Sequence, residues 1–216
     1  MHILVIGSTR GTGRLLVDRL LRSGHDVRAM IRDEAQAADL TDAGATPVLG
    51  DLEGDLDAAF DTPDAPIDAV MFCAGSGSST GPDATMRVDL NGAVRVIDRC
   101  VADGIGRYVQ LSSIGADDPV AGPESMRHYL AAMHARDRIL QASGLAATIV
   151  RPGGLTDDAA TGEVQLGVPR LDERGSIPRA DVAAVLAACV ERPETAGAVF
   201  EVVSGEQPIA DAVASL

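Results

Sequence analysis

The chain contains no lysine and no tryptophan, and aromatic residues make up only 2% of its 216 positions. All 18 basic residues are therefore arginines, and they face 32 acidic residues, so the formal net charge is −14. A nucleic-acid partner would need a clustered basic face and aromatic stacking platforms, and this composition disfavours both. An anionic membrane surface is disfavoured for the same electrostatic reason. The acidity fits salt adaptation and the codon bias of a GC-rich genome equally well.

Cysteine is also scarce. Cys73, Cys100 and Cys189 each stand among apolar neighbours, and an odd count without a C-x-x-C spacing argues against a disulfide framework and against a zinc site. We therefore expect buried reduced thiols and no metal. No apolar run approaches the roughly 20 residues that span a bilayer. The opening MHILVIG enters a predicted strand without a charged leader, so we expect a soluble cytoplasmic protein.

Short apolar runs bounded by glycine or proline recur along the chain and predict buried parallel strands. They cover residues 3–7, 27–31, 46–50, 68–75, 107–113, 147–154 and 198–205. Amphipathic stretches alternate with them, and the clearest are 11–23, 83–103, 125–142 and 180–191. This alternation predicts an α/β fold, a Rossmann-like doubly wound parallel sheet of about six or seven strands with helices on both faces. We expect one domain over 1–216, with residues 152–178 as an irregular excursion on the substrate side.

The first motif is GSTRGTG, between the first predicted strand and the first predicted helix. Glycines let the backbone turn tightly beside a pyrophosphate, and the helix N-terminus offers unpaired N–H groups to it. The motif predicts a dinucleotide site, with flavin still possible, formed by Gly7, Ser8, Thr9, Arg10, Gly11, Thr12 and Gly13.

The second predicted strand ends at Arg32. An arginine at this place accommodates the 2′-phosphate of NADP, whereas a carboxylate would accept the ribose 2′-OH of NAD. Arg10 could converge on the same phosphate, and Asp33 could favour NAD if it turned inward. We expect NADP(H), with NAD(H) as the alternative.

Two more strand ends carry candidate cofactor contacts. Asp51 and Leu52 follow the third strand, and Asp51 can face the adenine amino group. Ala74 and Gly75 follow the fourth strand, where their backbone can lie along the cofactor. Open α/β sheets bind ligands at these carboxyl ends.

A serine pair and a tyrosine form the candidate catalytic set. Ser112 and Ser113 end the fifth strand, and Tyr129 stands on the next predicted helix. Such hydroxyls can meet over a nicotinamide and polarise one carbonyl oxygen. An ordinary strand-end turn and a half-buried helix tyrosine would give the same spacing.

With these motifs in family order, the chain resembles the short-chain dehydrogenase/reductase superfamily, and it is most similar to the compact atypical branch of NAD(P)-binding, NmrA-like or sugar epimerase-like proteins. The resemblance also rests on IVRPGGLTDD and SIPRADVA. It implies a bound nicotinamide, Ser and Tyr near its reactive carbon, and Pro152 and Gly153 near its nicotinamide end. Relatives are monomers or homodimers, and neither state is favoured here.

Two residues depart from the family pattern. Met133 replaces the lysine of Tyr-x-x-x-Lys, and Asp89 stands where many relatives have asparagine. The lysine favours the phenolate that alcohol oxidation needs as a base. Arg136, His128 and His134 are basic residues near Tyr129 in the sequence, and we expect each to be a surface residue rather than a substitute.

The sequence thus favours an NADP(H)-dependent reductase of a small carbonyl, quinone or flavin-like acceptor, because a neutral tyrosine can still donate a proton. The alternative is an NmrA-like sensor that binds NAD(P) with little or no turnover. Nothing in the sequence names the substrate, although we expect the loop 76–81 and the excursion 152–178 to form the walls of its pocket.

Overall fold

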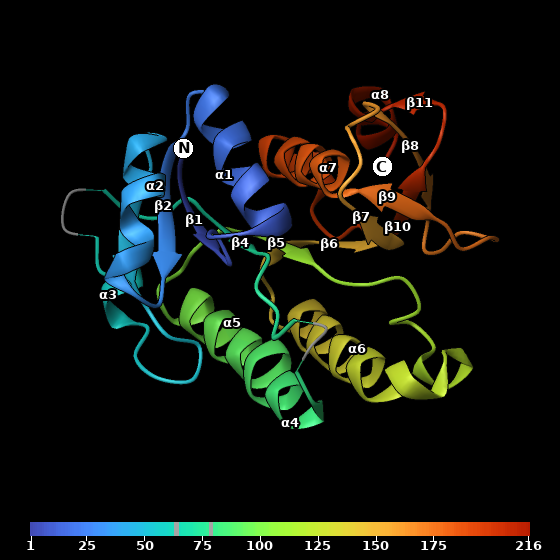
Figure 1. Cartoon of the computed structure of the whole chain (residues 1–216), viewed down its shortest axis with the longest axis horizontal. Coiled ribbons are helices and arrows are strands. Elements are labelled where there is room, and N and C mark those ends of the chain that lie inside the picture. Colours follow the sequence, from blue (N-terminus) through green and yellow to red (C-terminus); the bar gives the residue numbers. More distant parts are fainter. Residues whose placement is uncertain (63–64, 78–79) are drawn as a thin grey trace.

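The computed structural model of the protein describes residues 1–62, 65–77 and 80–216. One nine-stranded sheet runs through it in the order β11-β8-β10-β6-β5-β4-β1-β2-β3 (Figure 1). All seven predicted strands are present and pair in parallel with one another, as β1 (His2–Ile6), β2 (Asp26–Ile31), β3 (Thr46–Leu49), β4 (Ala69–Phe72), β5 (Arg107–Leu111), β6 (Ala146–Pro152) and β10 (Val199–Ser204). The strand order reverses between β1 and β4, the position where doubly wound sheets bind dinucleotides.

The region 152–178 is more regular than the sequence predicts. β7 (Gly154–Thr156) and β9 (Ser176–Pro178) pair with each other, and β8 (Glu163–Gly167) joins the main sheet antiparallel to β10. β11 (Gln207–Pro208) then pairs with β8. The prediction of an irregular excursion is wrong for β8, because a short strand buried on only one side has no continuous apolar run.

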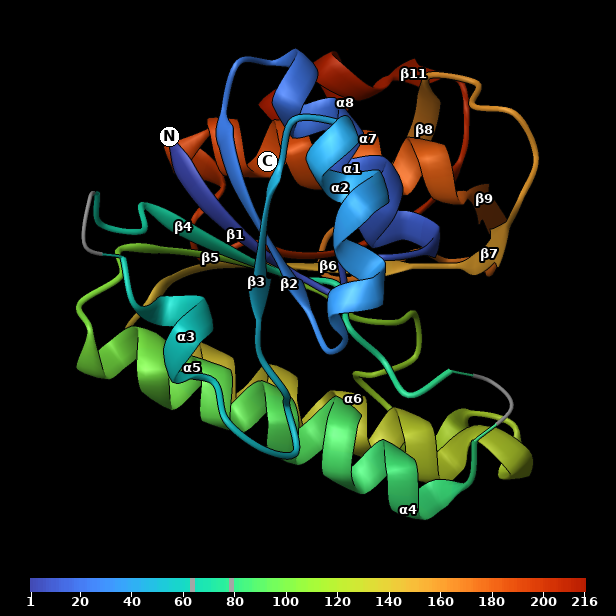
Figure 2. The same ribbon diagram turned by 60° about the vertical axis from the view of Figure 1, so that its left-hand side comes forward.

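Helices cover both faces of the sheet (Figures 1 and 2). One face carries α1 (Gly11–Arg22), α2 (Ala37–Asp42), α7 (Arg179–Glu191) and α8 (Ile209–Ala214). The other carries α3 (Asp57–Phe60), α5 (Ala93–Ala102) and α6 (Arg127–Ala142). α4 (Pro82–Ala84) continues through a π-helical segment (Thr85–Gly92) into α5. Short 3₁₀ turns lie at Glu34–Gln36, Pro119–Ala121, Glu124–Met126 and Pro193–Thr195.

The alternation of side chains along the strands explains the two layers. In β1, Ile3 and Val5 belong to the core under α1 and α7, whereas Leu4 and Ile6 belong to the core under α5. Both layers bury mainly aliphatic side chains, so the core is formed with few aromatic residues. Two of the three free cysteines, Cys100 and Cys189, are buried as expected, and Cys73 is half-buried.

The two edge strands share one feature. β3 and β11 are both short, and each contains a proline, Pro47 and Pro208. In the part of the chain that the structure describes, no helix is long and apolar enough to cross a membrane.

Candidate functional site

The glycine loop joins β1 to α1 and packs against the segment that follows β4. Gly7 has a φ of +88°, and a Cβ at this position would lie 2.5 Å from the Ala74 backbone nitrogen. A Cβ on Gly13 would overlap the Gly7 carbonyl oxygen. Only glycine at these two positions lets the start of α1 lie this close to the ends of β1 and β4.

The start of α1 fits the diphosphate of a dinucleotide. Arg10 stands at the N-cap, no side chain of the described residues caps the helix, and its first turn has no acidic residue, so within this part of the chain the backbone N–H groups of the turn are left for an anion. The Arg179 side chain lies 3.7 Å from where a Gly11 Cβ would be. The buried Thr12 hydroxyl has no hydrogen-bond partner among the described residues. Arg179 stands at the start of α7, and nothing in the sequence motifs indicates that it neighbours this loop.

The remaining predicted residues of the glycine loop are Ser8, Thr9 and the Arg10 side chain. The Ser8 hydroxyl is fully buried and donates to the Met30 carbonyl oxygen at 2.7 Å, which ties the loop to β2. Only the Ser8 backbone is left for a cofactor. Thr9 is half-buried in the same loop, and the exposed Arg10 side chain extends toward Gly77.

At the end of β2, Asp33 and Arg32 are arranged differently. The Asp33 carboxylate caps the 3₁₀ turn by accepting from the Ala35 N–H at 2.9 Å, and Gln36 completes a capping box. The Arg32 side chain is exposed and makes no hydrogen bond or ion pair with the described residues. Arg32 is thus the charged side chain that is free at this strand end.

The ends of β3 and β4 are fixed by local contacts. Asp51 Oδ1 accepts from the Glu53 N–H at 3.0 Å, and the buried Leu52 packs where a Gly92 side chain would otherwise be. Beyond Ala74, a Cβ on Gly75 would lie 3.0 Å from Asp89 Oδ1.

Asp89 anchors the segment after β4. Its carboxylate is almost fully buried and accepts from the Ser76 N–H at 3.0 Å. The π-helical segment that carries Asp89 is thereby attached to the predicted cofactor loop. Positions 78 and 79 of the predicted loop 76–81 lie outside the described residues.

The two candidate serines take different roles. Ser112 donates to the buried Asp137 carboxylate at 2.9 Å, and Gln110 (2.7 Å) and Arg151 (2.9 Å) bind the same carboxylate. Ser112 is therefore part of a buried polar network between β5, β6 and α6. The Ser113 hydroxyl donates to the Ile114 carbonyl oxygen at 3.3 Å and lies near enough to the Tyr129 phenol to act on its pKa.

Tyr129 is half-buried at the start of α6, and its surroundings act on the phenol in opposite directions. Burial has the largest effect and raises its pKa above the ordinary value near 10. The Arg136 charge and a hydrogen bond from Ser113 lower this pKa, whereas the Asp89 and Asp137 charges raise it further. The net result is a raised pKa, so the phenol is protonated at neutral pH.

Met133, which stands where the family pattern has a lysine, is fully buried. Met133 is buried in a small apolar cluster with Ala116 and Ala132, and Tyr129 packs against this cluster. The exposed His128 does not substitute for the lysine, and the His134 ring is bound to the Ala116 carbonyl oxygen at 2.7 Å.

Arg136 is not the surface residue that the sequence predicts. It is only 2% exposed, its guanidinium lies 5.6 Å from the centre of the Phe72 ring, and it donates to the Leu111 and Asp89 carbonyl oxygens. Among the described residues no carboxylate pairs with it. The signal was present in the sequence, since positions 129, 133, 136 and 140 form one helical stripe and three of them are apolar or aromatic.

The end of β6 connects these elements. The Pro152 carbonyl oxygen accepts from the Ile114 N–H at 3.0 Å, and a Cβ on Gly153 would overlap the Gly175 carbonyl oxygen. Pro152 and Gly153 thus lie beside the segment that follows Ser113. The Arg151 side chain turns away into its ion pair with Asp137.

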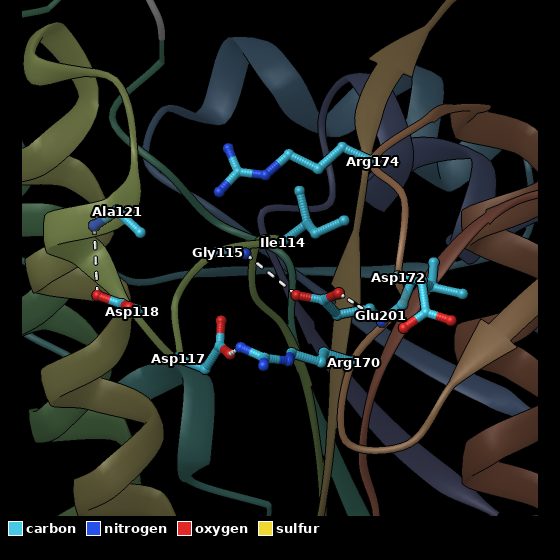
Figure 3. A pocket seen from close by; sticks show the side chains of 10 residues that line it. Ile114, Gly115, Asp117, Asp118, Ala121, Arg170, Asp172, Arg174 and Glu201 are labelled. Atoms are coloured by element: carbon cyan, nitrogen blue, oxygen red, sulfur yellow. Dashed lines mark hydrogen bonds and ion pairs between the residues drawn. The ribbon is translucent and has the colours of Figure 1, made fainter.

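A cavity of about 250 Å³ opens beside this segment (Figure 3). Residues from three regions line it, the turn after β5, the loop before β9, and β10: Ile114, Gly115, Asp117, Asp118, Ala121, Arg170, Leu171, Asp172, Arg174 and Glu201. The excursion 152–178 therefore contributes one wall of this cavity, through Arg170, Leu171, Asp172 and Arg174. The described residues of the loop 76–81 do not line this cavity.

Comparisons with known proteins identify the family. A family model described as NAD(P)H-binding matches residues 7–193. The chain belongs to this family. This assignment agrees with the sequence resemblance to atypical short-chain dehydrogenases/reductases and with the Rossmann-like sheet.

Three individual proteins align with this chain over nearly its whole length. "Uncharacterized sugar epimerase YhfK" from Bacillus subtilis is 39% identical over 217 residues and covers 100% of both chains. A solved Bacillus halodurans structure, provisionally named an NAD-dependent epimerase/dehydratase, superimposes with a TM-score of 0.95 at 43% identity, again over 100% of both chains. ChuY, an anaerobillin reductase from Escherichia coli O157:H7, gives a TM-score of 0.74 at 25% identity over 94% of this chain and 97% of its own.

Proposed function

We propose that the protein is an NADP(H)-dependent reductase of a small carbonyl, quinone or flavin-like acceptor, with Tyr129 as the proton donor. One observation carries the proposal: the Tyr129 phenol lies beside Ser113, and burial raises its pKa above the ordinary value. At neutral pH such a phenol is an acid and a hydrogen-bond donor, and it is a poor base.

The charges at the end of β2 support NADP(H) over NAD(H). A carboxylate that binds the ribose of NAD must face the cofactor, but the Asp33 carboxylate is engaged in its capping box. Arg32 is exposed at the same strand end, and its guanidinium can bind a 2′-phosphate in bidentate geometry.

In the proposed carbonyl reduction, Ser113, Tyr129 and Arg136 have different roles. The bound nicotinamide supplies the hydride. Ser113 and Tyr129 donate hydrogen bonds to the carbonyl oxygen, and the Tyr129 proton moves to that oxygen as the carbon is reduced. The resulting phenolate is stabilised by the positive charge of Arg136 and by the Ser113 hydroxyl, both of which lower the Tyr129 pKa.

Alcohol oxidation and sugar epimerisation are less well supported. Both need the phenolate as a base before the hydride leaves, and the raised Tyr129 pKa leaves little of it at pH 7. We therefore assign the reductive direction, although several relatives are named for epimerases.

Two titrations test the cofactor assignment. NADPH and NADH are titrated by calorimetry into cofactor-stripped protein, and we expect tighter binding of NADPH that Arg32→Ala weakens. Arg22→Ala is the matched control, because it removes the same charge from an exposed position in the last turn of α1. Tighter binding of NADH, or equal effects of the two variants, would contradict the assignment.

Turnover tests the catalytic assignment. With 9,10-phenanthrenequinone as acceptor, Tyr129→Phe and Ser113→Ala should each lower kcat by about 100-fold or more. Ser112→Ala is the control and should lower mainly stability, because its hydroxyl serves Asp137. Unchanged turnover of Tyr129→Phe would remove Tyr129 from the mechanism.

The alternative function is an NmrA-like sensor that binds NAD(P) without turnover. It is favoured by the closed apolar cluster around Met133, which replaces the usual lysine. Tight cofactor binding without NADPH consumption across carbonyl, quinone and flavin acceptors would establish it.

A further inference from the structure

The cavity that begins at the residue after Ser113 is suited to the part of a substrate that does not react. Ile114 and Gly115, which line it, directly follow Ser113. A Cβ on Gly115 would lie 3.7 Å from the Leu130 side chain on α6 and 3.3 Å from the Arg174 guanidinium. The cavity therefore adjoins the strand end that carries Ser113. Its volume of about 250 Å³ is slightly below the range of drug-sized pockets, so it suits a small group.

Glu201 fixes the two walls of the cavity. Its carboxylate is 3% exposed and accepts from the Gly115 N–H at 3.2 Å with one oxygen and from the Leu171 N–H at 2.9 Å with the other. The Glu201 carboxylate thus joins the turn after β5 to the loop before β9 (Figure 3).

Two other carboxylates on the cavity wall already have partners. Asp117 pairs with Arg170 at 3.6 Å, and Asp118 accepts from the Ala121 N–H at 3.3 Å. Asp172 lies across Glu201 from the Arg174 guanidinium (Figure 3). Among the described residues, none of these carboxylates forms an ion pair with Arg174.

Arg174 is the exposed cation of this cavity that is left for an anionic ligand. It makes no ion pair or hydrogen bond with any described residue, and its guanidinium extends above Ile114 and Gly115 at the side of the cavity that faces α6 (Figure 3). A guanidinium has five N–H donors in a planar fork that matches a carboxylate.

We propose that Arg174 binds a carboxylate of the substrate, so that the preferred acceptors are small carbonyl compounds that carry a carboxylate. This inference rests on the reductase function proposed above. Glu201 then acts as a positioning residue, because it holds the Leu171 side of the Arg174 loop against Gly115.

A pair of aldehydes that differ only in charge tests the proposal. The probes are 4-carboxybenzaldehyde and its methyl ester, reduced with NADPH. Arg174→Gln should lower kcat/KM for the acid by about ten- to a hundredfold, the range for a hydrogen bond to a charged group, and leave the ester within about twofold. Arg138→Gln, which removes an exposed arginine on α6, is the charge-matched control and should affect neither probe.

Two outcomes would overturn the proposal in the turnover assay. One is an equal loss with acid and ester. The other is weaker NADPH binding by Arg174→Gln, which would assign this arginine to the cofactor.

Binding separates this proposal from the reductase function. Terephthalate, which has no reducible carbonyl, is titrated by calorimetry into the protein saturated with NADP⁺. We expect binding that Arg174→Gln weakens about tenfold or more even if no aldehyde is turned over. Absent binding, or binding that Arg174→Gln leaves unchanged, would overturn the carboxylate site.

Discussion

Asp137 should be one of the most sensitive positions in the protein. Its carboxylate is fully buried and binds Arg151, Gln110 and Ser112 at 2.7 to 2.9 Å. Asp137→Asn keeps the size and shape of the side chain but removes the charge. The Arg151 guanidinium, whose side chain is 6% exposed, then stays buried without its counter-ion.

The expected loss of stability follows from the unpaired charge left on Arg151. Breaking a buried ion pair from one side costs about 3 to 5 kcal/mol, because the remaining charge keeps its desolvation penalty. For a chain of this size each kcal/mol corresponds to about 2–4 °C in Tm, so Asp137→Asn should lower Tm by roughly 6–20 °C.

Urea unfolding of a small set of variants checks the reasoning. Asp103→Asn is the control, because its ion pair with Arg99 is partly exposed and should contribute only about 0.2–1 kcal/mol. The double variant Asp137→Asn/Arg151→Met should be more stable than Asp137→Asn alone, since it also removes the unpaired charge. An Asp137→Asn variant no less stable than Asp103→Asn, or singles that simply add in the double, would refute the argument.

Three further predictions concern the site. Gly13→Ala should abolish NADPH binding, because its Cβ would overlap the Gly7 carbonyl oxygen; calorimetry checks this, with Gly106→Ala, which meets nothing within 4 Å, as control. Met133→Lys should lower the free energy of unfolding by about 3–5 kcal/mol, because it would bury an unpaired charge at a fully buried position. An unchanged urea midpoint would contradict the burial of this position. The kcat for carbonyl reduction should stay constant from about pH 7 to 9 and fall only above pH 10. The proton donor is active while protonated, so a raised Tyr129 pKa moves the loss of activity upward, and a decline centred below about pH 9 would exclude Tyr129 as the donor.

The parallel core of the fold could be predicted from the sequence because its strands are buried on both faces. Such strands read as continuous apolar runs, and all seven were confirmed. The short elements α2, α3 and β8 have no such signature, since each buries only one side over four to six residues. Their formation depends on the sheet that they cover.

The candidate site was predictable in outline and less so in its polar interior. The glycine loop packs against the end of β4, and Ser113 lies near Tyr129 at the end of β5; their joint role at a cofactor stays a prediction. Adjacent residues at a strand end point to opposite sides, so the sequence could not decide that Ser112 serves Asp137 while Ser113 lies near Tyr129. The burial of Arg136 was missed although its helical stripe indicates it. Glu201 was missed because a charged residue is expected to be exposed unless its partners, here distant in sequence, are known.

The two edge strands have a consequence for self-association. Proline lacks the N–H that a new strand would pair with, and short edge strands containing it resist edge-to-edge aggregation. With Pro47 in β3 and Pro208 in β11, both ends of the nine-stranded sheet are poor templates for a further strand. A continuous intermolecular sheet, the arrangement from which fibrils grow, is therefore disfavoured at both edges.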